Sequence, residues 1–123
     1  IILKANIENK VHLMGYQENV FKFLIRAKCF ILSSLWEDPG FVLVEAALSN
    51  TSIISSNCPN GPKEIIQNNG YLFKNNNIDD LEIKFEEFLK VSENNANQNK
   101  LELKKRIRMF TQYSHYKNLN KII

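Results

Sequence analysis

The stretch "CFILSSLWEDPGFVLVEAALSN", from Cys29 to Asn50, places an apolar run, a Pro-Gly corner and an apolar helical pattern in direct succession. The run Cys29–Ser34 is apolar almost throughout, which is typical of a strand buried on both faces of a parallel sheet. The helix cannot begin before Pro39, because the residue that precedes a proline is pushed out of the helical region. A helix is therefore predicted from about Gly40 to Ser49. Strand, corner and helix together predict one unit of an α/β fold.

The same order of strand and helix continues on both sides of this stretch. We expect a partial Rossmann-like parallel sheet with flanking helices, in which ligands lie where the carboxyl ends of the strands meet the following loops. Residues 1–92 are predicted to form this α/β domain, the Asn-rich stretch 93–99 a linker, and residues 100–123 a C-terminal helical segment. The other strands are predicted at Val11–Gly15, Ser52–Ser56 and Gly70–Phe73, and the other helices at Asn19–Ala27, Pro62–Gln67, Ile78 to about Ser92, and Leu101–Phe110.

The composition sets bounds on the class of protein. The chain has 123 residues, 44% of them hydrophobic and 24% charged, with a net charge of +3. This suits one small domain or part of a larger one, and the charge is too small to indicate a nucleic-acid partner. No apolar run approaches the ~18 residues of a membrane-spanning helix. The two cysteines, Cys29 and Cys58, predict reduced thiols in the cytoplasm, and the abundant Asn, Lys and Ile are typical of an AT-rich bacterial genome. Because the chain begins with Ile1 rather than methionine, we expect a fragment.

Two glutamates flank the corner. At the predicted helix start, the amides of Gly40, Phe41 and Val42 have no partner within the helix and, together with the helix dipole, favour an anion such as phosphate. Glu45 lies one turn further along, roughly 6 Å along the helix axis, where its carboxylate can accept two hydrogen bonds from neighbouring hydroxyls such as a ribose diol. Glu37 can do the same for hydroxyls on the other side of the anion. The corner therefore predicts a site for a sugar, a diphosphate and a ribose in that order.

Residues Gly15–Phe73 resemble the C-terminal domain of the group 1, or family 4, retaining glycosyltransferases, which have the two-domain GT-B fold. The hallmark of that family, Glu-x7-Glu, is present as Glu37-Asp-Pro-Gly-Phe-Val-Leu-Val-Glu45. The pieces "VHLMGYQEN", "FILSSLWE", "EAALSNTSIISSNCPNGPKEII" and "NNGYLF" resemble the family in the same order. One departure is that many members have Gly-Phe-Gly after the first Glu, whereas this chain has Asp38-Pro39-Gly40, which leaves the identity of the sugar open.

This resemblance implies roles for individual residues. Glu37 would hold the transferred sugar as the catalytic residue, and Glu45 would hold the ribose of a nucleotide-sugar donor. Residues 1–92 would then be a partial nucleotide-sugar-binding domain, the C-terminal half of a GT-B enzyme. The remaining donor-binding positions implied are the backbone amides at the helix start and the loop that borders the base, namely Gly40, Phe41, Val42, Gly15 and Tyr16.

The resemblance also implies a reaction. The enzyme would transfer a hexose or N-acetylhexosamine, with retention, from a UDP-linked donor to a glycan or lipid-linked acceptor during polysaccharide biosynthesis. The nucleotide-sugar is a substrate, and neither a cofactor nor a bound metal is expected. In the family, the Arg and Lys that bind the donor phosphate lie upstream of Ile1, and the missing strands lie between those at Val11 and Phe30. The chain alone is therefore expected to be inactive and not to fold robustly.

Two alternatives remain open from the residues. One is an inactive glycosyltransferase remnant that keeps only the scaffold. The other is a non-catalytic α/β interaction module that docks a partner or a membrane through the basic helix at Lys104–Arg108. A peripheral contact with the inner face of the membrane would also suit an enzyme that works on lipid-linked acceptors. The remaining polar or aromatic residues have structural interpretations: His12 and His115 are too far apart to indicate a metal pair, Asp79 and Asp80 cap a helix, and Tyr113 and Tyr116 pack.

Overall fold

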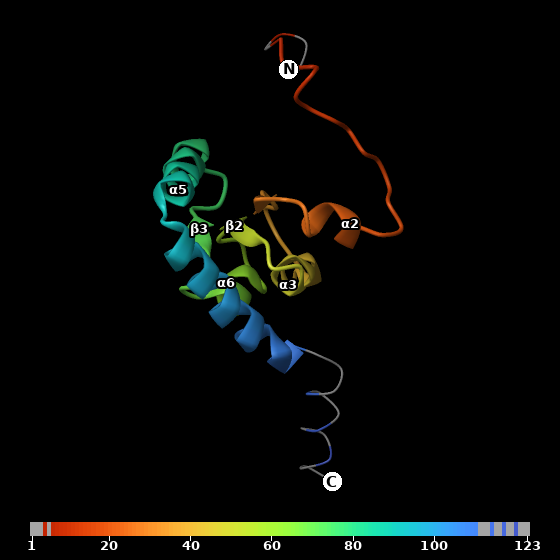
Figure 1. Cartoon of the computed structure of the whole chain (residues 1–123), viewed down its shortest axis with the longest axis vertical. Coiled ribbons are helices and arrows are strands. Elements are labelled where there is room, and N and C mark those ends of the chain that lie inside the picture. The colour runs from red at the N-terminus through yellow and green to blue at the C-terminus, as the bar shows by residue number, and fades with distance from the viewer. Residues whose placement is uncertain (1–3, 5, 111–113, 115–116, 118–119, 121–123) are drawn as a thin grey trace.

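Three parallel strands form the sheet at the centre of the molecule. The computed structural model describes residues 4, 6–110, 114, 117 and 120. Within this part of the chain the strands are β1 (Cys29–Leu32), β2 (Ser52–Ser56) and β3 (Tyr71–Phe73), in the order β1-β2-β3. All pairs are parallel, with Phe30 opposite Ile53 and Ser55 opposite Leu72. The fold class is α/β, as predicted (Figure 1).

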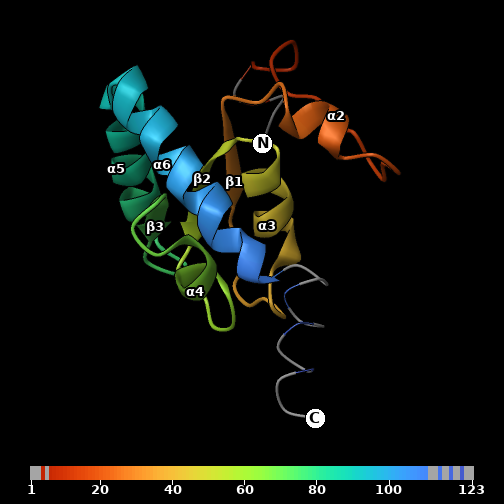
Figure 2. The same ribbon diagram turned by 60° about the horizontal axis from the view of Figure 1, so that its bottom comes forward.

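Helices cover both faces of the sheet. Helices α3, α4 and α6 pack against one another on one face, while α5 packs on β3 and β2 from the other. Figure 2 shows α6 running across the face that also carries α3 and α4. The described helices are α2 (Phe21–Leu24), α3 (Phe41–Leu48), α4 (Pro62–Ile66), α5 (Ile78–Lys90), α6 (Glu93–Arg106) and a 3-10 helix η1 (Ile107–Phe110).

One apolar core lies between β2 and the helices α3, α4 and α6. Its most buried side chains include Leu43 of α3, Ile53 of β2 and Ile66 of α4. The short helix α2 is tied to this core because the Thr51 hydroxyl donates a hydrogen bond to the Leu24 carbonyl at 2.6 Å. The apolar run of β2 is buried, whereas β1, which its sequence predicts to be buried on both faces, leaves Ile31 44% exposed.

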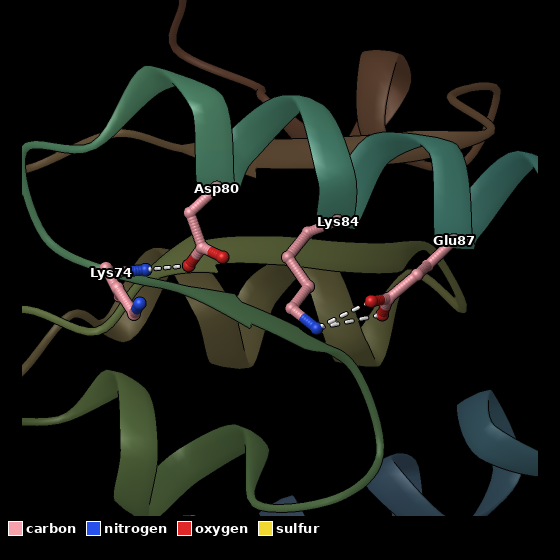
Figure 3. Close-up of polar contacts among 4 residues, drawn as sticks. All are labelled: Lys74, Asp80, Lys84 and Glu87. Atoms are coloured by element: carbon pink, nitrogen blue, oxygen red, sulfur yellow. Dashed lines mark hydrogen bonds and ion pairs between the residues drawn. The ribbon is translucent and has the colours of Figure 1, made fainter.

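The start of α5 is held by a network of polar groups. The Asn77 side chain accepts a hydrogen bond from the Asp80 amide at 2.8 Å, and the Asp80 carboxylate accepts one from the Lys74 amide. One turn further, Lys84 and Glu87 form an ion pair at 2.7 Å (Figure 3). The N-cap of α5 is therefore Asn77 rather than Asp79 or Asp80, while the Asp80 carboxylate ties the helix start to the preceding chain.

The strand predicted at Val11–Gly15 is wrong. The structure describes this stretch without a strand, and Leu13 and Met14 are exposed. A strand needs a neighbour to receive its backbone hydrogen bonds. In the described part of the chain, no strand lies beside this stretch, so its apolar residues remain uncovered.

The linker predicted at 93–99 is also wrong, because these residues form the first half of α6. The Ser92 hydroxyl accepts a hydrogen bond from the Asn95 amide at 3.4 Å and caps the helix. Further along, Leu103 and Ile107 enter the core beside β2. This packing stabilises a helix that its asparagine-rich sequence does not favour by itself.

The C-terminal helical segment is only partly described. The predicted helix Leu101–Phe110 corresponds to the end of α6 and to η1. The predictions for Tyr113, His115 and Tyr116 fall outside the residues that the structure describes.

Leu103 is the buried residue through which α6 packs on the core. Its side chain is 1% exposed, so Leu103→Ala leaves a cavity and is expected to lower the free energy of unfolding by about 2–5 kcal/mol. Leu101 on the same helix is 53% exposed, and Leu101→Ala is the matched control, expected to change it by less than about 0.5 kcal/mol. Urea unfolding followed by circular dichroism measures both. Equal effects of the two substitutions would contradict the docking of α6.

Candidate functional site

The corner between β1 and α3 is built around Gly40. Gly40 precedes the first residue of α3 with φ 79° and ψ 45°, in the left-handed region. This conformation favours glycine over residues with a Cβ atom. The structure therefore agrees with the prediction that Gly40 adopts angles that a side chain would disfavour.

The first amides of α3 are open. Among the residues described, the amides of Gly40, Phe41 and Val42 donate no hydrogen bond, and the first amide in the helix that does is that of Leu43, to the Gly40 carbonyl at 3.0 Å. Open amides at a helix start, reinforced by the helix dipole, favour an anion. The geometry at this point is the one that the sequence predicts.

Glu37 folds back over this helix start. A Cβ atom added to Gly40 would lie 3.5 Å from both Cγ and Oε2 of the Glu37 side chain. The Glu37 side chain is half-buried, and its carboxylate accepts no hydrogen bond from any described residue. An unpaired carboxylate therefore stands directly beside the open amides.

Glu45 lies on the outer face of α3. It follows Phe41 by four residues and precedes Leu48 by three, so the three side chains share one face of the helix. Phe41 and Leu48 are both exposed on that face, whereas the opposite face carries the buried Leu43 and Ala46. Glu45 is half-buried, and no described residue pairs with its carboxylate.

The loop that follows β2 locks the corner in place. Gly61 has φ 121°, and a Cβ atom added to it would lie 1.9 Å from the Pro39 carbonyl oxygen. The Glu37 amide donates to the Pro59 carbonyl at 3.4 Å, and the Ser56 hydroxyl donates to the Ser34 carbonyl at 2.5 Å. The loops after β1 and β2 are thus in direct contact at the same end of the sheet.

The predicted loop at Gly15 and Tyr16 meets the helix start only in part. Gly15 and Val42 both line an apolar cavity of about 390 Å³ under α2. Tyr16 is 90% exposed and does not line this cavity. Neither Glu37 nor Glu45 lines it, so the structure brings Gly15 near the start of α3 but leaves Tyr16 in solvent.

Comparison with known proteins places this arrangement in a family. Residues 1–108 match the family described as glycosyl transferases group 1. The chain belongs to this family. The resemblance inferred from Glu37 and Glu45 with their flanking segments is therefore confirmed at the level of the family.

Three relatives illustrate the match. An uncharacterized glycosyltransferase of Methanocaldococcus jannaschii is 46% identical over 66 residues, 54% of this chain and 16% of that protein. A poly(ribitol-phosphate) alpha-N-acetylglucosaminyltransferase of Staphylococcus aureus is 32% identical over 66% of this chain and 17% of its own length. The N-acetylgalactosamine-N,N'-diacetylbacillosaminyl-diphospho-undecaprenol 4-alpha-N-acetylgalactosaminyltransferase of Campylobacter jejuni is 26% identical over 53% of this chain and 18% of its own. The chain spans less than a fifth of the length of each relative.

Solved structures share the fold. A glycosyltransferase from Rickettsia africae superposes with a TM-score of 0.79 at 20% identity, covering 86% of this chain and 29% of that one. The sucrose-phosphate synthase of Thermosynechococcus elongatus gives 0.76 at 17% identity, over 99% and 33% of the two chains. The C-terminal domain of a group 1 glycosyl transferase from Francisella tularensis gives 0.67 at 18% identity, over 91% and 58%. The chain has the α/β fold of the GT-B glycosyltransferases.

The contact of Gly61 with Pro39 is the feature of this site that sequence reasoning missed. The stretch "CPNGP" reads as a tight loop, and nothing in it shows which residue it touches. The local sign of a special backbone here is Gly61 itself, because glycine adopts positive φ without steric cost and is the usual residue where two backbone segments approach closely.

The two cysteines do not contribute a nucleophile. Cys29 is half-buried in β1, and burial raises the pKa of its thiol to about 11, so the thiol stays protonated near neutral pH. Cys58 is buried near the start of the loop after β2, and both thiols are free. The described residues contain no group of His, Cys, Asp and Glu that could hold a metal ion.

Proposed function

We propose that this chain is the donor-binding part of an enzyme that transfers a hexose or N-acetylhexosamine from a UDP-sugar, with retention, to a glycan or lipid-linked acceptor. The observation that carries the proposal is the unpaired carboxylate of Glu37 beside the three open amides that begin α3. Two relatives bear names that specify N-acetylhexosamine transfer with alpha linkages. An alpha product is what a retaining transfer from an alpha-linked donor gives.

Each group has a task in this proposal. The diphosphate lies at the amides of Gly40, Phe41 and Val42, where the helix dipole stabilises the negative charge that develops on the leaving group. Glu45, one turn further along α3, accepts hydrogen bonds from the ribose hydroxyls. Glu37 accepts them from the transferred sugar on the other side of the diphosphate.

We place the reaction in the cytoplasm, at the inner face of the membrane. The name of the Campylobacter jejuni relative describes an acceptor linked to diphospho-undecaprenol, which is a lipid carrier. None of the helices in the described part of the chain is long and apolar enough to cross a bilayer. The membrane contact that we propose is peripheral.

The contacts of the basic helix speak against the alternative of a non-catalytic docking module. Lys105 is paired with Glu102 at 2.7 Å. Arg106 donates two hydrogen bonds to the Glu64 carbonyl, from Nε at 3.1 Å and from Nη2 at 2.6 Å. Two of the cations that would dock a partner are thus engaged within the fold.

Titration with UDP tests the proposal. Saturable binding is expected, and Glu45→Gln is expected to weaken it about tenfold or more, because a hydrogen bond to a charged group contributes roughly 1.5–3 kcal/mol. Glu82→Gln on α5 is the matched control and should leave the affinity unchanged, since Glu82 is exposed and lies on the helix that covers the opposite face of the sheet. Chemical-shift changes of the labelled chain measure the affinity.

Substitution of Glu37 distinguishes binding of the sugar from binding of the nucleotide. Glu37→Gln is expected to leave UDP binding unchanged and to weaken binding of the UDP-sugar. If UDP shows no saturable binding, the chain is the inactive remnant described above. If the unaltered chain and Glu45→Gln bind UDP with equal affinity, Glu45 does not contact the ribose.

A further inference from the structure

We infer that Asn60–Gly61, in the loop after β2, is a site of spontaneous deamidation that inactivates the corner proposed to bind the donor. In an Asn-Gly pair the amide nitrogen of the glycine can attack the side-chain carbon Cγ of the asparagine. Glycine hinders this attack least, because it has no Cβ atom. The sequence contains two such pairs, Asn60–Gly61 and Asn69–Gly70. The modification itself does not depend on the proposed function, whereas its effect on the donor does.

Both reacting groups of Asn60–Gly61 are unengaged. Asn60 is exposed, and its carboxamide forms no hydrogen bond within the described residues. The Gly61 amide, which is the nucleophile, also donates to none of them, and only the Gly61 carbonyl is used, by the Ile65 amide at 2.8 Å. The loop must turn Cγ toward this nitrogen, and no hydrogen bond of either group opposes the turn.

The second pair is held closed by packing. A Cβ atom added to Gly70 would lie 2.8 Å from Cγ2 of Ile66 and 2.9 Å from the carbonyl oxygen of Ile53 in β2. The Asn69 amide donates to the Ile66 carbonyl at 3.0 Å, and β3 begins directly after Gly70. The backbone on both sides of this pair is thus fixed, so attack requires a local opening first. The same dipeptide is therefore an internal control.

The reaction needs no reagent except water. The Gly61 nitrogen bonds to Cγ of Asn60, the bond from Cγ to the side-chain nitrogen breaks, and ammonia leaves with the proton of the Gly61 amide. Water then opens the cyclic succinimide at one of its two carbonyl carbons. Opening at Cγ leaves an aspartate at position 60 in an ordinary main chain. Opening at the main-chain carbon leaves an isoaspartate, whose main chain is longer by one carbon.

Either product disturbs the corner between β1 and α3. A Cβ atom added to Gly61 would lie 1.9 Å from the Pro39 carbonyl oxygen, and the Pro59 carbonyl accepts from the Glu37 amide at 3.4 Å. A longer main chain between these two contacts must displace one of them. Figure 2 shows the loops after β1 and β2 at the same end of the molecule. Both products also add a carboxylate to this end, where negative charge opposes an anion at the start of α3.

Ageing of the folded chain in mildly alkaline buffer, followed by peptide mass spectrometry, tests the site. Cleavage after Lys63 places the two pairs in different peptides, and replacement of NH₂ by OH raises the mass of the converted one. We expect Asn60 to convert about tenfold or more faster than Asn69, because the reaction at Asn69 waits for a local opening. In urea the two rates should approach each other. Equal rates in the folded chain, or faster conversion of Asn69, overturn the inference.

Asn60→Gly is the matched control. Asn60 has φ 63°, which glycine adopts without strain, so this change removes the carboxamide and keeps the loop. UDP titration of aged samples should show that the binding fraction of the unaltered chain falls in step with conversion at Asn60, while aged Asn60→Gly binds as the fresh chain does.

The two measurements separate the possible failures. Conversion at Asn60 without loss of UDP binding overturns the inactivation, and so does an equal loss in aged Asn60→Gly, since another residue would then be responsible. If the fresh chain does not bind UDP, the proposed function is rejected and the effect on the donor with it. The mass spectra still decide the modification in that case.

Discussion

Gly61→Ala is expected to abolish UDP binding, although Gly61 contacts no part of the proposed donor. The added Cβ atom would lie 1.9 Å from the carbonyl oxygen of Pro39 and 2.7 Å from its carbon. Both are backbone atoms, so no side chain can rotate away and one loop must move. A backbone forced out of its conformation costs about 1–3 kcal/mol before any clash is counted. The corner that aims the amides of Gly40 and Phe41 would be displaced, and UDP titration with a thermal melt measures the loss.

Two other glycines provide controls for this result. Gly15 has φ 58° but no atom within 4 Å of an added Cβ, so Gly15→Ala carries backbone strain alone. Gly40→Ala also carries strain, and its nearest neighbours, at 3.5 Å, are side-chain atoms of Glu37 at ordinary contact distance. The expected order of damage is therefore Gly61 well above Gly40 and Gly15. If Gly61→Ala is as mild as Gly15→Ala, the loop after β2 does not hold the corner.

The elements that sequence reasoning placed correctly are those whose signals are local. The apolar run Ser52–Ser56 has the bounds of β2, and Pro62 begins α4 as a proline at a first helical position does. The conformation of Gly40 follows from its place at the end of a Pro-Gly corner. In each case a few neighbouring residues restrict the backbone enough to fix the result.

The features that were missed depend on residues distant in sequence. Whether Val11–Gly15 forms a strand depends on a neighbouring strand, and whether 93–99 is helical depends on Leu103 reaching the core. The contact between Gly61 and Pro39 joins loops that follow different strands. Composition and periodicity describe each segment alone, so they carry no information on these contacts.

The open edge of β1 is expected to govern how the isolated chain behaves. Within the described residues β1 pairs only with β2, and Ile31 at its centre is 44% exposed. Apolar cavities flank this strand on both sides. One of about 340 Å³ is lined by Ile31 and by Phe85 of α5, and the other, under α2, is lined by Phe30. An unpaired strand edge with apolar flanks is a template for pairing with another chain.

Residues 1–123 alone are therefore expected to self-associate, to melt at a lower temperature than the Ile31→Lys variant and to transfer no sugar. Ile31→Lys should restore a monomer, because a charge on an edge strand opposes pairing. Ile83→Lys is the matched control: Ile83 is 53% exposed on α5 but lines neither cavity, so it should leave self-association unchanged. Light scattering after gel filtration, with thermal melts of the three chains, measures these effects. If the unaltered chain is monomeric, melts cooperatively and shows measurable turnover, the unpaired edge of β1 does not cause self-association.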